Sequence, residues 1–171
     1  DLHYPLRRQR QMCIRDRFTT ALFVGCASPG VQVTTDDEKS QAIKAAYDGY
    51  LVNDFTASNE LYSDETAIYI NSVETISNEE NIAAFSSHHD FYTDISMSRT
   101  YIQTSAYDND LGTWTHAWFV WKGTGKASGN TYEVPCHVAY QWGDDGKVVQ
   151  TWFFSDQSNH LKELAAAGVE L

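Results

Sequence analysis

The second half of the chain is dominated by β-strand patterns, and this feature constrains the fold more than any other. From Asp94 onward apolar and polar side chains alternate, and β-branched and aromatic residues are frequent. The pattern predicts four strands, at residues 95–107, 112–122, 131–142 and 147–155. The intervening segments YDNDLG, KGTGKASGN and GDDGK are rich in the residues that hairpin turns require. The second half is therefore predicted to form an antiparallel meander.

The segment before the meander predicts helices and one short strand. Residues 35–38 read T-x-x-E, the pattern of a capping box, and apolar residues follow at helical spacing to about Asn53. A second, short helix is predicted to end near Tyr62. The stretch AIYIN, residues 67–71, predicts a strand.

Two further helices are predicted on either side of the meander. Ser77 begins a second capping box, S-x-x-E, and opens a helix that runs to about Tyr92. A last helix is expected from about Asp156, with Gly168 at its C-terminal cap. Helices gathered before a meander predict an α+β fold in which the helices pack on one face of a curved sheet.

Composition excludes several classes of function. The net charge is −11, and only one arginine, Arg99, follows residue 17. An acidic body of this kind repels phosphate groups, so nucleic-acid binding and attachment to anionic membrane surfaces are not expected. All tryptophans lie in the last three predicted strands, which is more aromatic surface than one sheet face needs. Part of it is expected to line a pocket or a subunit interface.

The N-terminal segment is predicted to lie outside the folded domain. Its arginines precede a short apolar run and the tetrad FVGC, which ends at Cys26 and is similar to a lipoprotein signal with a lipidated cysteine. The stretch MCIRDR resembles translated adapter sequence. We interpret residues 1–17 as non-native or disordered, residues 18–33 as the remnant of a signal and a linker, and residues 34–171 as one domain.

This interpretation implies an exported bacterial protein, held at the membrane only by a lipid on Cys26. A disordered arm on a cytoplasmic protein is the alternative. With Cys26 lipidated and Cys13 absent from the mature chain, Cys136 would be the only thiol, and it is expected to be buried and inert.

The chain resembles a known family over roughly residues 38–167. The stretches ELYSDETAIYIN, VWKGTGKASGNTYEVP and DGKVVQTWFFSD, with the helix that begins SNEEN, are similar to the nuclear transport factor 2-like superfamily, near its SnoaL-like branch. The resemblance implies a cone, or half barrel, in which a bent antiparallel sheet wraps a long N-terminal helix and leaves a cavity. Members include ketosteroid isomerase, polyketide cyclases, limonene epoxide hydrolase and non-catalytic binding modules, so the resemblance implies a pocket but no particular reaction.

The resemblance also suggests catalytic residues. His137 matches the position of the oxyanion-hole aspartate of ketosteroid isomerase, where an imidazole could donate a hydrogen bond or transfer a proton. The alternative to a catalytic role is that His137 lies in the pocket and only forms a hydrogen bond. Asn71 matches the general base of that enzyme; an amide cannot abstract a proton, which argues against isomerase activity, but it could orient a ligand carbonyl. Tyr47 and Tyr50 lie on the first helix near the position of the donor tyrosine, and either could reach the pocket. The favoured alternative is that both are core residues with satisfied hydroxyls.

A wider set of aromatic and imidazole side chains is expected to line the cavity: Tyr50, Tyr69, His116, Trp118, Phe119 and Phe153. Phe153 stands where an epoxide hydrolase would need an aspartate, which argues against that chemistry. His116 and His137 could face each other on neighbouring strands. No metal site is expected, because His88 and His89 are adjacent on a helix and point about 100° apart.

Two hypotheses follow. In the first, the chain is a cofactor-free SnoaL-like enzyme that acts on a small, largely apolar molecule, with His137 as the central group and Asn71 and Tyr47 as helpers. In the second, it is a non-catalytic lipoprotein module that binds a ligand or dimerises through its sheet. A homodimer is expected in either case.

Overall fold

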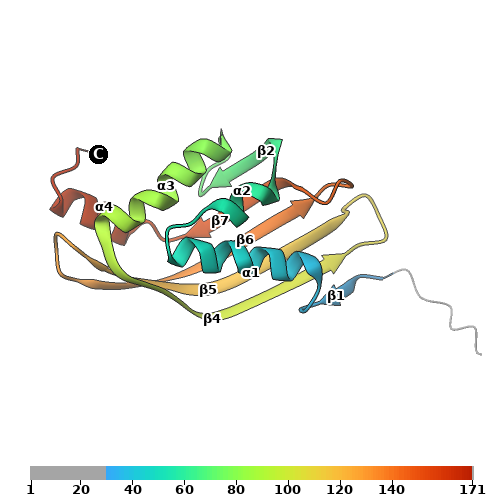
Figure 1. The fold of residues 1–171 in the computed structure, drawn as a ribbon, viewed down its shortest axis with the longest axis horizontal. Helices are drawn as coiled ribbons and strands as arrows, with labels where there is room; N and C mark the ends of the chain where they lie inside the picture. The colour runs from blue at the N-terminus through green and yellow to red at the C-terminus, as the bar shows by residue number, and fades with distance from the viewer. Residues whose placement is uncertain (1–29, 171) are drawn as a thin grey trace, which may run out of the picture.

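Residues 30–170, the part of the chain that the computed structural model describes, form one curved sheet and four helices (Figure 1). The sheet has seven strands in the order β1-β4-β5-β6-β7-β2-β3. The strands are β1 (Gln32–Thr34), β2 (Tyr62–Ile70), β3 (Thr75–Ile76), β4 (Tyr92–Ala106), β5 (Thr113–Gly125), β6 (Thr131–Trp142) and β7 (Val148–Ser155). The α+β architecture with a curved sheet is confirmed.

Strands β4 to β7 form the predicted antiparallel meander, and their bounds lie within a few residues of those expected. Strand β2 extends further than the predicted stretch and pairs in parallel with β7, Ile68 opposite Thr151. The sequence analysis predicts neither β1 nor β3. Strand β1 is a three-residue edge strand that pairs with the end of β4, so the sheet includes residues before the predicted start of the domain at residue 34.

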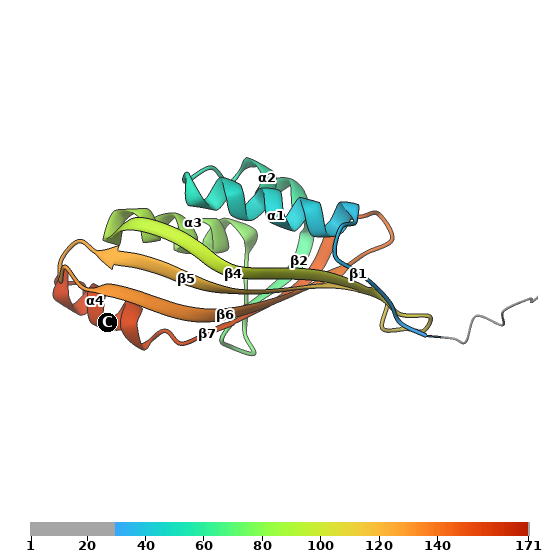
Figure 2. The same ribbon diagram turned by 90° about the horizontal axis from the view of Figure 1, so that it is seen from below.

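Three helices lie on one face of this sheet: α1 (Glu38–Leu51), α2 (Thr56–Leu61) and α3 (Asn78–Phe91). Figure 2 shows them together on one side, with the fourth helix, α4 (Ser158–Ala166), at one end of the molecule. The Ser77 capping box is confirmed. The Ser77 hydroxyl accepts a hydrogen bond from the Glu80 backbone N–H, and the Glu80 carboxylate accepts one from the Ser77 backbone N–H.

The start of α1 differs from the predicted capping box. Asp37, not Thr35, is the N-cap: its carboxylate accepts hydrogen bonds from the backbone N–H groups of Lys39 and Ser40. The same carboxylate also accepts from the hydroxyls of Ser40 and Thr104, so it ties α1 to β4. An ionised carboxylate makes a stronger cap than the threonine hydroxyl, and tertiary contact with β4 adds to this advantage.

The core lies between the helices and the inner face of the sheet. Ile43 of α1 is fully buried, as is Ala117 of β5. Along β6 the even-numbered residues from Val134 to Trp142 are buried, which confirms the predicted alternation of that strand.

Two irregularities in β4 accompany the curvature of the sheet. The register between β4 and β5 shifts next to Asp94 and again next to Arg99, and both residues have a positive φ, of 54° and 52°. Bulges of this kind bend a strand and increase its twist. Figure 2 shows β4 curving beneath the helices.

Within residues 30–170 no helix is long and apolar enough to cross a membrane. The predictions about residues 1–17 and about lipidation at Cys26 fall outside the described residues.

Candidate ligand-binding cavity

A cavity of about 90 Å³ lies between the three helices and the inner face of the sheet. Its lining is largely aromatic and aliphatic, and among the described residues it includes no aspartate, glutamate, lysine or arginine. The aromatic members of the lining are Tyr47, Tyr50, Phe55, Tyr62, Phe85, Phe119, Trp121, Tyr140 and Phe153. A lining of this kind suits a neutral and mostly apolar occupant.

A chain of hydrogen bonds forms the polar part of the cavity wall. Trp121 Nε1 lies 2.8 Å from the Tyr50 hydroxyl oxygen, and this oxygen lies 2.9 Å from His88 Nδ1. Indole nitrogen can only donate, so Tyr50 accepts from Trp121. The Tyr50 hydroxyl proton has no other acceptor within residues 30–170, so we assign it to His88 Nδ1. His88 Nδ1 is therefore an acceptor. The neutral ring carries its proton on Nε2, an atom that makes no hydrogen bond within the described residues.

The surroundings of His88 keep it neutral. Burial lowers the pKa of His88 to about 4, and repulsion from His160 and His89 acts in the same direction. At neutral pH this side chain is thus a hydrogen-bond donor at Nε2 and a weak base. It also lines a second pocket, of about 40 Å³, which shares Trp121, Cys136 and Phe153 with the first. His88 therefore stands where the two pockets meet.

The remaining polar groups in the cavity are uncharged: several hydroxyls, the Asn81 amide and the Cys136 thiol. The hydroxyls of Tyr47 and Tyr140 lie 3.0 Å apart, and burial raises the pKa of both phenols. Thr151 lines the same cavity, and its buried Oγ1 has no hydrogen-bond partner within residues 30–170. A ligand with a small polar group could satisfy this atom.

Four residues expected at the site do line the cavity: Tyr47 and Tyr50 on α1, Phe119 on β5 and Phe153 on β7. They come from three elements that are distant in sequence. The curved sheet and the helix packed across it bring them together.

The other five residues expected at the site do not line the cavity. His137 does not line the cavity but lies on the opposite face of the sheet, as do its partner His116 and the rings of Trp118 and Tyr69. Strand register explains this placement: Cys136 and Val138, the neighbours of His137, line the cavity, so His137 must point the other way. The expectation that His116 and His137 face each other is correct, with Nδ1 of the first 3.2 Å from Nε2 of the second.

Asn71 is also not among the residues that line the cavity. It follows β2 with a positive φ of 48°, a conformation that asparagine tolerates better than most residues. Its side-chain oxygen accepts a hydrogen bond from the Ser155 backbone N–H, which joins the ends of β2 and β7. This role is structural.

His88 is the functional candidate that sequence reasoning missed. A signal for it exists, because Asn81, Phe85 and His88 follow one another at helical spacing and all line the cavity. The adjacent pair His88 and His89 points to different partners, since His89 Nε2 contacts the Tyr50 backbone oxygen at 2.8 Å. Within the described residues no group of three or more potential metal ligands occurs. Cys136 is buried, as expected, and burial raises the pKa of its thiol to about 11.

Comparison with known proteins identifies the fold. No family model matches the chain, and no curated protein matches its sequence. Solved structures do match: a candidate polyketide cyclase from Silicibacter sp. TM1040, with 17% identity and a TM-score of 0.56, covers 73% of this chain and 93% of its own. IdmH, a candidate polyketide cyclase from Streptomyces antibioticus, is 17% identical with a TM-score of 0.55 and covers 78% of this chain and 100% of its own.

A third neighbour supports the same fold. A protein from Catenulispora acidiphila with a ketosteroid isomerase-like fold, solved with trimethylamine, is 16% identical with a TM-score of 0.51 and covers 80% of this chain and 96% of its own. These likenesses define the class by its fold, a curved α+β sheet packed against helices. Within that class, the chain has the nuclear transport factor 2-like fold in the form of the SnoaL-like proteins.

Proposed function

We propose that this SnoaL-like domain binds a small, largely apolar molecule with one hydrogen-bond-accepting oxygen, and that His88 recognises this oxygen. The proposal rests on one observation: a neutral imidazole, held at Nδ1 by Tyr50, has an Nε2–H without a partner in residues 30–170, and its ring lines both the apolar cavity and a smaller pocket that also includes Asp156 and His160. A carbonyl, ether or hydroxyl oxygen is the natural acceptor for that proton.

The size of the cavity limits the ligand. An apolar cavity of roughly 150 Å³ is enough to hold benzene, and ligand sites for drug-sized molecules usually exceed about 300 Å³. The cavity here measures about 90 Å³, so a compact ring or a short branched chain fits it better than a steroid or a polyketide. A larger ligand would require side chains such as Phe85 and Phe153 to move.

Charge limits the ligand as well. No ionised side chain lines the cavity among the described residues, and burial would leave a ligand charge without a partner. The ligand is therefore neutral.

Cyclopentanone and cyclopentane provide a matched pair of probes, because they differ in the carbonyl oxygen alone. We expect both to shift the NMR signals of cavity residues. His88→Phe should weaken cyclopentanone binding about fivefold to tenfold, the value of one hydrogen bond, and leave cyclopentane binding nearly unchanged. His137→Phe, on the opposite face of the sheet, is the control and should change neither. Equal weakening of both probes in His88→Phe, or no binding of either probe to the wild type, would refute the proposal.

A second function, cofactor-free catalysis, is favoured by the same hydrogen-bond chain. A neutral imidazole can polarise a carbonyl group and stabilise an enolate that forms from it. The names of the structural neighbours include cyclases and a hydroxylase, which is consistent with such chemistry on this fold. A base of pKa about 4 is weak, however, so His88 would serve as an electrophile more readily than as a base.

Deuterium exchange separates binding from catalysis. If the cavity promotes enolisation, the α-protons of cyclopentanone should exchange in D₂O faster with wild-type protein than with His88→Phe. If exchange is the same with either protein and binding still depends on His88, the chain is a binding module.

A further inference from the structure

Helix α4 stands next to His88 at one end of the molecule. Figure 1 shows α4 beside the C-terminal end of α3, the helix that carries His88. Four residues at the start of α4 or just before it, Asp156, Gln157, Asn159 and His160, line the smaller pocket of about 40 Å³. His88 lines this pocket as well as the cavity. A ligand group that enters the smaller pocket at His88 therefore meets side chains of α4.

The surroundings of His160 repeat those of His88. His160 Nδ1 lies 3.0 Å from the Tyr92 hydroxyl oxygen. The corresponding distance from His88 Nδ1 to the Tyr50 hydroxyl oxygen is 2.9 Å. In each pair the tyrosine occupies one ring nitrogen and leaves Nε2 without a partner within residues 30–170. Burial lowers the pKa of both imidazoles, so both rings are uncharged at neutral pH.

The two tyrosines leave their histidines with different freedom. Tyr50 accepts from Trp121, and its proton is assigned to His88 Nδ1, so the His88 ring carries its own proton on Nε2. The Tyr92 hydroxyl has His160 as its only partner within the described residues, so it can donate to Nδ1 or accept from it. His160 Nε2 is accordingly an acceptor in one tautomer and a donor in the other. The pair consists of one fixed donor and one nitrogen that is free to accept.

The two imidazoles are close enough to contact the same atom. The ring centroids of His88 and His160 lie 5.2 Å apart, and the ring planes meet at 63°. One oxygen that bonds two nitrogens at about 2.9 Å each can join nitrogens up to about 5.8 Å apart. The pocket that both rings line, of about 40 Å³, exceeds the roughly 10–15 Å³ that a water molecule needs, but it cannot hold a second ring. It suits one small polar group attached to an apolar body in the cavity.

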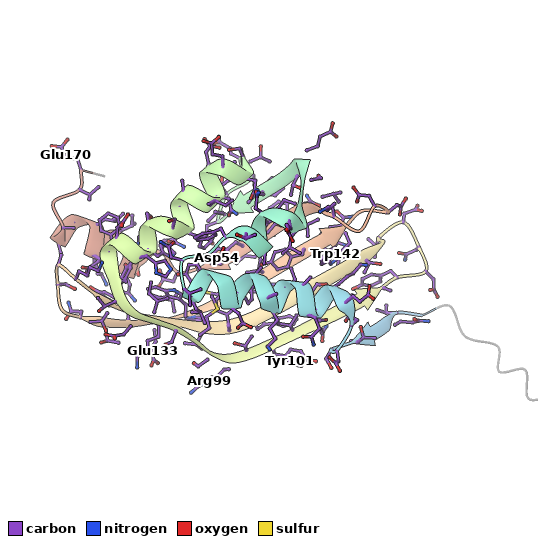
Figure 3. The ribbon with its side chains drawn as sticks, viewed as in Figure 1. Asp54, Arg99, Tyr101, Glu133, Trp142 and Glu170 are labelled. Carbon is purple, nitrogen blue, oxygen red and sulfur yellow. The ribbon has the colours of Figure 1, made fainter. Side chains whose placement is uncertain are left out.

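The charges around the smaller pocket disfavour an anion. The pocket includes the Asp156 carboxylate and, among the described residues, no lysine or arginine. The buried, ionised carboxylate of Glu163 also belongs to α4 and lies close enough to His160 to act on its pKa. Two further carboxylates, those of Glu133 and Glu170, lie at the surface and line neither pocket (Figure 3). A ligand carboxylate or phosphate would therefore be repelled in this pocket.

We infer that a ligand hydroxyl bridges the two histidines, accepting a hydrogen bond from His88 Nε2–H and donating one to His160 Nε2. The inference rests on the proposed function and narrows its ligand, from a molecule with any accepting oxygen to a small apolar alcohol. Other groups lack one of the two roles. A carbonyl or ether oxygen has no proton to donate, and an ammonium group has no lone pair to accept from His88. His160 is thus the residue that sets the preference for an alcohol.

Cyclopentanol and cyclopentanone test this preference, because the two probes differ only at the carbon that carries the oxygen. In NMR titrations of the full chain, cyclopentanol should bind about fivefold to tenfold more tightly than cyclopentanone, the value of one further hydrogen bond. His160→Phe removes the acceptor, so it should make the two affinities equal and leave cyclopentanone binding nearly unchanged. His137→Phe, on the opposite face of the sheet, is the control and should keep the preference of the wild type.

The tautomer of His160 supplies a second measurement. Nitrogen-15 NMR of the histidine rings shows which ring nitrogen carries the proton. Bound cyclopentanol should hold the His160 proton on Nδ1, where it donates to Tyr92, and cyclopentanone should have no such effect. Tyr92→Phe removes this acceptor and keeps the ring, so it should reduce the preference for cyclopentanol.

The outcomes separate this inference from the proposed function. Equal affinity of the wild type for cyclopentanol and cyclopentanone, or tighter binding of the ketone, would overturn the inference without any variant. A preference for cyclopentanol that persists in folded His160→Phe would assign it to another group and overturn the role of His160. Failure of the proposed function is seen separately, in the comparison of cyclopentanone with cyclopentane in wild type and His88→Phe.

Discussion

Tyr50 donates its hydroxyl proton to His88 Nδ1 across 2.9 Å, and this hydrogen bond joins α1 to α3 at the wall of the cavity. The same hydroxyl oxygen accepts from Trp121, so one atom connects two helices and a strand. Tyr50 is buried, and its hydroxyl both accepts and donates a hydrogen bond. The stability of the cavity wall should therefore depend on Tyr50.

Tyr50→Phe removes the hydroxyl and keeps the ring. It leaves the Trp121 indole N–H and His88 Nδ1 without partners in a buried place, so the free energy of unfolding should fall by about 1–3 kcal/mol. Tyr101→Phe is the matched control, because its hydroxyl bonds Gln103 at the surface; the cost there should be under about 0.5 kcal/mol. Urea unfolding measures both, and equal losses would contradict the role given to Tyr50.

Stability should fall as the pH is lowered from about 6.5 to about 4. Burial lowers the pKa of His88 to about 4 in the folded chain, whereas an unfolded histidine titrates near 6.5. Between these pH values the unfolded chain binds a proton that the folded chain does not, so acid favours unfolding, by up to the order of 3 kcal/mol.

His88→Phe should flatten this part of the pH profile of unfolding. NMR titration of the His88 ring supplies the direct measurement, and a ring that titrates near 6.5 in the folded protein would show that the site is not buried as described. The variant also separates His88 from the other histidines, since their contributions to the profile would remain.

Asp37→Ala should destabilise the start of α1 more than Thr35→Ala. The Asp37 carboxylate accepts hydrogen bonds from two backbone N–H groups and from the side chains of Ser40 and Thr104, whereas Thr35 is exposed and outside the helix. Loss of an N-cap costs about 1–2 kcal/mol, and Thr35→Ala should cost only a few tenths. Thermal unfolding of the two variants decides between the observed cap and the capping box that the sequence suggested.

Glu163→Gln should loosen the C-terminal helix. The buried Glu163 carboxylate of α4 accepts from the backbone N–H of Ala127 at 2.8 Å and from the backbone and hydroxyl of Ser128, in the turn between β5 and β6. Burial alone would raise the pKa of Glu163, but these hydrogen bonds outweigh it and the pKa lies below its ordinary value. In Glu163→Gln an NH₂ group replaces one carboxylate oxygen, so a hydrogen-bond donor faces the donors of Ala127 and Ser128. The free energy of unfolding should fall by about 1–3 kcal/mol.

Hydrogen exchange of the α4 amides measures this effect locally. Glu133→Gln, at an exposed carboxylate with only a distant lysine partner, is the control and should leave α4 protected. Gly125→Ala should act like Glu163→Gln, because a Cβ at Gly125 would lie 2.0 Å from a Glu163 carboxylate oxygen. Protection of α4 that is unchanged in both variants would exclude this contact as its anchor.

Much of the architecture follows from local patterns. The alternation in residues 131–142, the hairpin turns and the Ser77 capping box each depend on residues close in sequence, and the structure bears out all three. The resemblance to SnoaL-like proteins extended these local patterns to a whole fold. Of the residues expected at the site, the structure places Tyr47, Tyr50, Phe119 and Phe153 in the lining of the cavity.

The tertiary structure decided the position of His137 against the family resemblance. Alternation divides β6 into an apolar face that includes Cys136 and a face with Glu133, His137 and Gln141; the resemblance put His137 in the cavity, whereas the helices cover the apolar face. The packing of α1–α3 put Cys136 against the cavity and left His137 outside, and it brought His88 from α3 to Tyr50 of α1. These contacts join residues far apart in sequence, and no local pattern records them.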